Sequence, residues 1–468
     1  MDGCASNIAT MQCLGANISK DNARPYFIHP QTKEKVYVML DACHMIKLIR
    51  NAFATCKNMH DGNGNRIEWQ YIMNLVQLQE EEGLHAATKV TKRYLNWQQE
   101  KMNVKLAAQT LSTDVANAID FCAIDLQLQQ FQNSAATSLF IKNMNNIFDL
   151  LNSRNFLCKN KSQEPISLSN IDRVKEDIKK YIDYLNNLYI DNVNIMSTKK
   201  KTGFLGMLIC LVCIRDISNE LIATKKMNFL LTYKMSQDHI EMFFSAIRSK
   251  GGHNNNPSAK QFCYAYRRLL HHTKLTILLH GNAIAQDNTD MLNIRYPNKG
   301  IDNIVNDFIE SEKENEGDIS DETFITERWC TSNYIKDVVA YIAGFVTRKV
   351  IKKIKCDICQ KLLIGTDNVS ALQERKCRGG LINASNDVIT LCYIAEKVIR
   401  EHSSVINKQH PIERLILIAL SCVSSTIFDN VLHMFEQAPL QDHRTDLIKF
   451  VLYTYLQLRL RHISVSKN

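Results

Sequence analysis

The sequence predicts an α+β protein in which helices dominate. Glycine and proline are scarce, 16 and 7 among 468 residues, which favours long helices over irregular segments. Residues 44–53, 103–122 and 175–189 repeat apolar side chains at helical spacing. Residues 34–40, EKVYVML, are β-branched and apolar and predict a buried strand. We therefore expect a small α/β element at the front, a large helical body and a helical C-terminal part.

The composition indicates a soluble protein of the cell interior. The chain carries 57 basic and 48 acidic residues, and its net charge of +9 permits nucleic-acid binding without requiring it. The 15 cysteines follow no regular framework and no signal peptide precedes them, which indicates reduced thiols in the cytosol or nucleus. The most apolar segment, residues 203–214, is shorter than the ~20 residues of a transmembrane helix. It predicts a buried core element, and we expect no membrane partner.

Residues 235–257, MSQDHIEMFFSAIRSKGGHNNNP, predict a helix with acids in its first turn. Ser236 is suited to the N-cap, and Gly251 to the C-cap. One apolar stripe at spacings of three and four consists of Ile240, Phe243, Phe244 and Ile247. An ordinary amphipathic helix accounts for this pattern. A metal-binding role for Asp238 and Glu241 needs further oxygen ligands from elsewhere in the chain.

Two other aspartates could supply such ligands. Asp41 directly follows the predicted strand and precedes Cys43 and His44. Asp2 lies in DGCASN, an Asp-Gly turn followed by small polar residues, which is typical of a surface turn. The residues alone leave open whether either aspartate joins Glu241 at a metal ion.

Five blocks in this order resemble the P-element transposases and the related THAP-domain transposase-like proteins. They are DGCASN (2–7), DACHMIKLIRN (41–51), KLAAQTLS (105–112), MSQDHIEMFFSAIRSKGGHNNNPSAKQF (235–262) and YIAGFVTRKVIKK (341–353). The resemblance implies a nuclear DNA transposase whose partially represented RNase H-like core is interrupted by a large all-α GTP-binding insertion domain and followed by a helical C-terminal domain. In that family two aspartates and a glutamate bind divalent metal, here Mg²⁺.

The resemblance also assigns roles to single residues. Glu241 matches the closing glutamate of the catalytic set, and Asp2 matches the second aspartate, both as metal ligands. Asp41 is the alternative second aspartate; otherwise it forms an accessory motif with Cys43 and His44. Carboxylates from distant segments suit this chemistry, because two Mg²⁺ ions must be held from several sides to activate a nucleophile and stabilise the leaving oxygen.

The expected GTP site is not a P-loop, because the sequence contains no G-x-x-x-x-G-K-[ST]. The positions that match the family's nucleotide site are Lys89, Val104, Ser112, Phe148, Asp149 and Asp238. By this match Lys89 meets phosphate, and Phe148 and Asp149 meet the base. An aspartate can accept the guanine N–H groups, and an aromatic ring can stack on the base. The family leads us to expect a basic residue where this chain has Asn103.

The resemblance predicts five regions. They are the incomplete N-terminal part of the core (1–50), the insertion domain (51–230), the closing part of the core (231–300), an acidic linker (301–331) and the helical C-terminal domain (332–468). No zinc-binding THAP finger is expected, because Cys4, Cys13 and Cys43-His44 lack its spacing. The strand that bears the first catalytic aspartate should precede DGCASN and is not in the chain. We therefore expect a truncated or domesticated transposase that is inactive as written.

Three further features leave alternatives open. Cys356 and Cys359, with Cys377 and Cys392, could bind zinc, but buried free thiols fit the spacing better. Two basic segments, 266–274 and 348–355, could contact DNA phosphates or be solvated helix surface. The alternative function is a non-catalytic nuclear protein that binds DNA or other proteins, and the sequence also leaves a homo-oligomer open.

Overall fold

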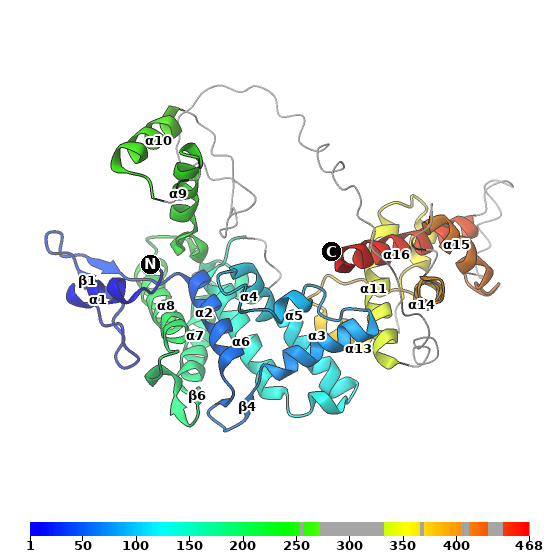
Figure 1. Ribbon diagram of the computed structural model, residues 1–468, viewed down its shortest axis with the longest axis horizontal. Helices are drawn as coiled ribbons and strands as arrows, with labels where there is room; N and C mark the ends of the chain where they lie inside the picture. The colour runs from blue at the N-terminus through cyan, green and yellow to red at the C-terminus, as the bar shows by residue number, and fades with distance from the viewer. Residues whose placement is uncertain are drawn as a thin grey trace.

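The protein is mainly helical, as the sequence predicts (Figure 1). The computed structural model describes residues 1–156, 158, 160–252, 254, 256–271, 332–365, 369–403, 406, 411–428 and 443–467. The predicted acidic linker and residues 272–274 of the first basic segment lie outside these ranges. None of the described helices has the length and apolar character that a membrane crossing requires.

The front of the chain forms a helix and a small hairpin. Helix α1 (Ala5–Cys13) precedes strands β1 (Tyr26–Ile28) and β2 (Lys35–Tyr37), which pair antiparallel with Phe27 opposite Val36. The prediction of a buried strand over 34–40 is wrong in extent and burial, because Lys35 and Val36 are exposed. Burial begins only after the strand ends, at Val38 and Leu40. The apolar residues therefore indicate where the chain enters the core and not where the strand is paired.

The body of the molecule is a bundle of helices around α8 (Thr202–Ser218). Residues 203–214 lie within α8 and are buried almost throughout, which confirms the predicted core element. The other helices are α2 (Ala42–Thr55), α3 (Gln70–Glu82), α4 (Val104–Thr110), α5 (Thr113–Asp120), α6 (Ala135–Leu151) and α7 (Ile171–Asn186). Helix α2 packs closely on α8, because Gly206 leaves room for the Met45 side chain.

Short strands and single turns complete the body. A four-stranded sheet has the order β4 (Arg66–Ile67), β3 (Met59–His60), β6 (Tyr189–Ile190), β7 (Val193–Asn194), and β5 (Ile166–Ser167) pairs with β8 (Phe229–Leu230). The turns are η1 (Lys92–Tyr94), η2 (Phe121–Asp125), η3 (Gln129–Phe131), η4 (Lys161–Gln163), η5 (Ile195–Ser197), η6 (Asn219–Ala223) and η7 (Thr232–Met235). The insertion therefore contains small sheets in addition to the predicted helices.

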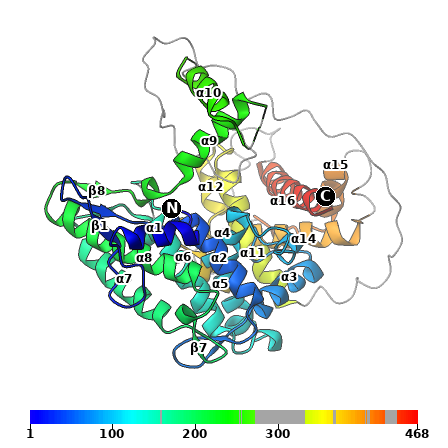
Figure 2. The ribbon, with the colours of Figure 1, turned by 60° about the vertical axis from the view of Figure 1, so that its left-hand side comes forward.

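Helices α9 (Asp238–Lys250) and α10 (Ala259–His271) form a hairpin that projects from the body (Figures 1 and 2). The predicted N-cap was one residue early: Gln237 precedes the helix, and the Ser236 hydroxyl accepts from the Asp238 N–H at 3.4 Å. The predicted apolar stripe is only partly buried. Ile247 packs against α10, whereas Ile240 is 58% exposed.

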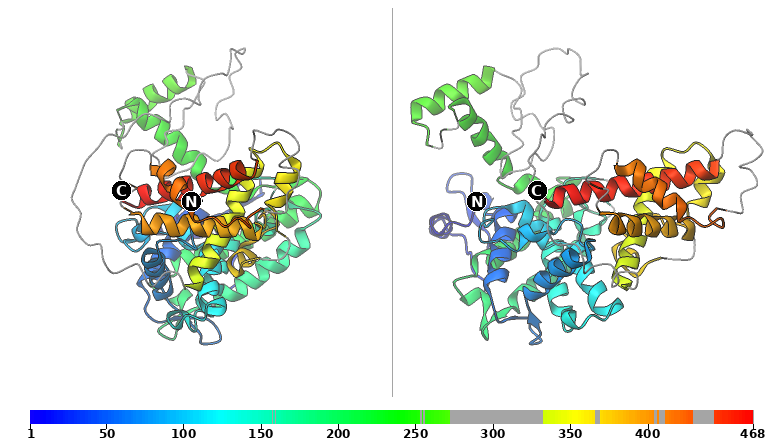
Figure 3. Two further views of the ribbon diagram at one scale, coloured as in Figure 1. Left: turned by 90° about the vertical axis from the view of Figure 1, so that its right-hand side faces the viewer. Right: turned by 45° about the vertical axis from the view of Figure 1, so that its right-hand side comes forward.

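The C-terminal region is a separate group of helices on the far side of the body from α1 and β1 (Figures 1 and 3). It comprises α11 (Asn333–Ile351), α12 (Asp357–Leu362), α13 (Ala371–Lys376), α14 (Asn386–Glu401), α15 (Pro411–Ser421) and α16 (His443–Lys467). Helices α11, α14 and α16 pack on one another. The buried Glu396 carboxylate of α14 lies among Arg400, Tyr455 and Arg459, and these arginines also donate to carbonyls at the end of α3.

Candidate active site

Asp41 anchors the first half of the candidate site at the N-terminus of α2. It is the N-cap residue and is 1% exposed, and its Oδ2 accepts from the His44 backbone N–H at 3.2 Å. The same oxygen lies 2.5 Å from His44 Nδ1. Burial alone would raise the pKa of Asp41, but the hydrogen bond and charge of His44 hold it below its usual value. The D-x-x-H spacing therefore fixes the imidazole with Nδ1 toward Asp41.

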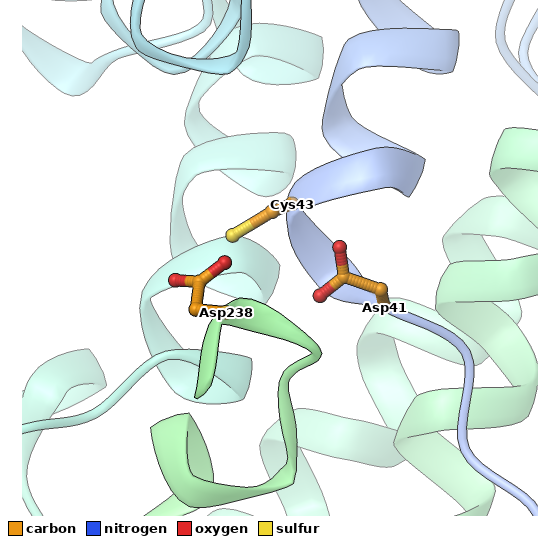
Figure 4. A group of neighbouring side chains, drawn as sticks. All are labelled: Asp41, Cys43 and Asp238. Atoms are coloured by element: carbon orange, nitrogen blue, oxygen red, sulfur yellow. The ribbon is translucent and has the colours of Figure 1, made fainter. Parts of the chain in front are cut away.

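Asp238, the first residue of α9, lies against Asp41 and Cys43 (Figure 4). One ligand atom from each of the three buried residues lies within 4.8 Å of the others, although Asp238 is nearly 200 positions from Asp41. Burial, followed by the charge of Asp41, raises the pKa of Asp238 to about 6. Burial and the same carboxylate raise the pKa of the Cys43 thiol, which stays protonated. Two carboxylates thus share a buried site beside a neutral thiol.

Glu241 and Asp2 lie on the solvent side of this group, and His44 is their common neighbour. His44 Nε2 is 3.9 Å from Glu241 Oε1. The pKa of Asp2 is lowered mainly by the hydrogen bond from the Cys4 N–H, with a further contribution from the charge of His44. Asp2 is outside the buried group of three. Both predicted metal ligands thus lie outside the buried group of Asp41, Cys43 and Asp238, and Glu241 lies beside His44.

The first residues of the chain are fixed against this site by backbone hydrogen bonds. The Met1 amino group donates to the Met39 carbonyl at 3.0 Å, and the Asp41 N–H donates to the Met1 carbonyl at 2.7 Å. With its side-chain oxygen turned toward the chain end, Gln237 accepts from the Asp2 N–H at 3.2 Å. The segments that carry Asp2, Asp41 and Asp238 are therefore tied to one another.

The donor set suits a divalent cation that prefers oxygen. Mg²⁺ takes carboxylate oxygens, and a protonated thiol such as Cys43 is a poor ligand for it. A cation would also offset the repulsion that raises the pKa of Asp238. The predicted zinc alternative at Cys356 and Cys359 finds no support in the described residues, because no third ligand gathers there.

The predicted nucleotide residues fall in four places. Asp149 and Phe148 lie on α6, where the Asp149 carboxylate accepts from Asn145 and Asn160 at 2.9 and 3.1 Å. Ser112 precedes α5, and the next residue, Thr113, donates its N–H to Asn145 at 3.2 Å. These residues therefore form one neighbourhood. Burial raises the pKa of Asp149 despite its hydrogen bonds.

The remaining predicted nucleotide residues lie elsewhere. Val104 begins α4, and Asn103 caps that helix by accepting from the Leu106 N–H at 3.1 Å. Lys89 is exposed in the segment after α3, and no hydrogen bond or ion pair within the described residues joins it to Asp149. Asp238 lies with Asp41 and Cys43. The structure also explains Asn103, which serves as a helix cap where the family led us to expect a cation.

Two residues that contribute to the site were not predicted from the sequence. Arg154 follows α6, and its charge lowers the pKa of both Asp238 and Cys43. Lys47 is buried one turn after His44. Burial lowers its pKa, and the charges of Glu241 and Asp41 offset part of this effect. The i, i+3 spacing of His44 and Lys47 after an N-cap aspartate was the available signal for the second residue. No local pattern marks Arg154.

Three family models match the chain. One is described as a TNP-like GTP-binding insertion domain and matches residues 43–165, and a TNP-like RNase H C-terminal domain matches residues 233–267. The third, the C-terminal domain of DNA transposase THAP9, matches residues 330–465. Together they reproduce the predicted order of a core interrupted by an insertion domain and followed by a C-terminal domain.

Two relatives match longer parts of the chain. The chain is 27% identical to human DNA transposase THAP9 over 99% of this chain and 53% of the relative. It is 26% identical to the Transposable element P transposase of Drosophila melanogaster over 72% of this chain and 44% of the relative. The chain thus spans about half the length of these proteins.

A solved structure, the Drosophila P element transposase strand transfer complex, matches with 25% identity, a TM-score of 0.47, and coverage of 58% of this chain and 60% of that one. The sequence and family matches confirm the predicted resemblance and the fold class. The chain is similar to DNA transposase THAP9 and to the P-element transposase, and its residues 43–165 match the family model of a GTP-binding insertion domain.

Proposed function

We propose that this chain carries the metal-dependent centre of a P-element-type transposase, which cleaves and joins DNA strands with GTP as cofactor. The observation that supports it best is that Asp41 and Asp238, from distant segments, gather beside Cys43, while Glu241 lies 3.9 Å from the imidazole that Asp41 holds. Helix packing alone gives no reason to gather three acids around one site. A shared divalent cation does.

Each residue has a distinct role in this proposal. Glu241 and Asp2 hold the metal on the solvent side, where a DNA strand can approach, and Asp41 and Asp238 complete the negative site beneath. His44 is held by Asp41 through Nδ1, so Nε2 is presented toward Glu241. When bound, a divalent cation supplies charge stabilisation for phosphodiester chemistry. The chain's own residues orient that cation and keep its carboxylates together.

We place GTP in the insertion domain at the neighbourhood of Ser112, Phe148 and Asp149. Asn145 and Asn160 hold the Asp149 carboxylate by their amides, which leaves its remaining acceptor capacity for the guanine N–H groups. Lys89 and Val104 are assigned to the phosphate side by resemblance. We also propose nuclear localisation, DNA as the partner and the five-region division, with the core at residues 1–50 and 231–300.

The experiment uses the full chain with supercoiled plasmid and either Mg²⁺ or Mn²⁺. Because the chain is expected to be inactive as written, we expect no nicked or joined products. Products that Glu241→Ala abolishes would show an active transposase instead, because losing one member of a catalytic set costs several orders of magnitude. Binding of Mn²⁺ is measured separately by electron paramagnetic resonance, and Glu241→Ala should weaken it, whereas the matched control Glu176→Ala, at an exposed glutamate of α7, should not. Wild-type chain that binds no Mn²⁺, or binds it equally well after Glu241→Ala, overturns the proposed metal centre.

A non-catalytic DNA-binding function is the second candidate. It is favoured by the exposed cations at and after the end of α11, which are Arg348, Lys349, Lys352, Lys353 and Lys355. Such cations neutralise phosphates and give salt-dependent binding. Binding of duplex DNA that Glu241→Ala leaves intact, by a wild-type chain that binds no Mn²⁺, would favour this candidate over the first.

A further inference from the structure

A cavity of about 380 Å³ lies between the insertion domain and the C-terminal helices, far in sequence from the carboxylate site. One wall is the segment after α3, which contributes Leu84, His85 and Thr88. The other walls come from α11, residues 380–382 and α16. Volumes of 300–1,000 Å³ are typical of small-molecule sites. The cavity is thus large enough for a small ligand and needs both domains to exist.

The walls are held together by buried hydrogen bonds. The Tyr334 hydroxyl of α11 donates to the Leu84 carbonyl at 2.9 Å and accepts from the Ala86 N–H at 3.1 Å. Lys376 donates to the Ala86 carbonyl, and Arg459 donates to the Gly83 carbonyl at 3.0 Å. Since these contacts fix both sides, a ligand does not have to order the walls. A preformed site loses less free energy on binding.

The mouth of the cavity presents flat apolar surface. Tyr341, Phe345 and Arg348 follow one face of α11 at spacings of four and three residues. Phe345 is 49% exposed, and Leu381, from another wall, is also exposed. Ile342 and Leu458 contribute further apolar side chains. A flat ring system fits between an aromatic and an aliphatic wall.

The lining contains basic side chains and no carboxylate among the described residues. The basic side chains are those of Arg348, Arg459, His85 and His462. Arg459 already pairs with Glu396, whereas Arg348 has no acidic partner in the part of the chain that the structure describes. His85 is buried, and its Nδ1 has no hydrogen bond. Burial, then the charge of His462, lowers the pKa of His85 to about 4, so it is neutral at pH 7.

We propose that this cavity binds a small organic anion with a flat apolar body, which lies between Phe345 and Leu381 with its negative group on Arg348. The proposal does not depend on the DNA chemistry above. Because the walls belong to two domains, the ligand binds only the assembled seam and stabilises it by mass action. The site is therefore a point at which a small metabolite-like anion can strengthen the contact between the insertion and C-terminal domains.

The test titrates the full chain with 8-anilinonaphthalene-1-sulfonate and follows its fluorescence and the thermal unfolding midpoint. We expect saturable binding at one site and a midpoint that rises with probe concentration. Arg348→Gln should weaken binding about two- to fivefold, as for a partly exposed ion pair. Leu381→Trp should fill the mouth and remove binding by more than about tenfold. Phe345→Ala, at an exposed ring, gives a second apolar variant should the tryptophan disturb the fold.

Two controls isolate the charge and the place. Lys353→Gln removes an exposed cation just after the same helix, outside the cavity, and should leave binding unchanged. N-phenyl-1-naphthylamine has the same rings without the sulfonate, and Arg348→Gln should leave its affinity unchanged. Equal losses for Arg348→Gln and Lys353→Gln, or full binding in both Leu381→Trp and Phe345→Ala, would overturn the proposal.

Discussion

Replacing Glu396 by glutamine should weaken the C-terminal domain by about 3 kcal/mol. The carboxylate is 2% exposed and accepts from Arg400 Nε at 2.5 Å, Arg459 Nε at 2.7 Å and the Tyr455 hydroxyl at 2.8 Å. Burial raises the pKa of Glu396, but Arg459 and Arg400 outweigh it and lower the value from 4.5 to about 2. At 1.36 kcal/mol per unit this is ~3 kcal/mol, which agrees with the roughly 3–5 kcal/mol for breaking a buried pair.

Native-state hydrogen exchange of peptides from α14 and α16 measures this free energy. A loss of ~3 kcal/mol accelerates exchange on the order of 100-fold where opening limits it. Because the folded pKa of Glu396 is depressed, its stabilisation is present above the unfolded value and is lost as pH falls from 4.5 through about 2. Glu374→Gln, at an exposed carboxylate of α13, should leave exchange unchanged. Exchange within about threefold of wild type in Glu396→Gln would refute the reasoning.

The other predictions concern the carboxylate site and the packing of α2. Because the pKa of Asp238 is raised to about 6, its ionisation destabilises the metal-free fold progressively as pH rises from 3.8 through about 6. Asp238→Asn should therefore raise the free energy of unfolding by up to ~3 kcal/mol at pH 8, and this gain should disappear near pH 4. Asp183→Asn, at an exposed aspartate, should leave the free energy of unfolding unchanged at both pH values. Urea titrations at pH 8 and pH 4 measure both variants. Gly206→Ala places a Cβ 2.1 Å from Met45 Sδ and should cost about 1–3 kcal/mol in the same assay. Gly251 has a negative φ, and a Cβ there would meet only the Arg248 carbonyl oxygen at 3.8 Å, so Gly251→Ala should change stability by less than ~0.5 kcal/mol.

The parts of the fold that local sequence determines were predictable. The apolar residues 203–214 identified the buried helix α8, and Gly251 identified the end of α9, because both signals lie within one element. The strand at 34–40 was predicted too long, because the apolar run continues past the paired residues Lys35–Tyr37. Val38 and Leu40 are buried although their backbone lies outside the paired strand. The apolar composition therefore predicts burial but not strand pairing.

The candidate site was only partly predictable. Family resemblance pointed to Asp2, Asp41 and Glu241, and the structure brings Asp41 and Glu241 to His44, while the role of Asp2 as a metal ligand stays a prediction. The pairing of Asp41 with Asp238 depends on packing between segments nearly 200 positions apart, which no local pattern encodes. The role of Asp238 as a nucleotide ligand or as part of the metal group stays a prediction.

Arg400 and Arg459 donate to carbonyls at the end of α3, and these contacts affect the order in which the protein folds during synthesis. Arg459 reaches the Gly83 carbonyl across 376 positions of sequence. Domains generally begin to fold from the N-terminus while translation proceeds. The carbonyls at the end of α3 therefore stay open to water until α16 has left the ribosome. A nascent chain stalled before that point should present this helix end to chaperones and proteases, and its protection should begin once α16 is complete.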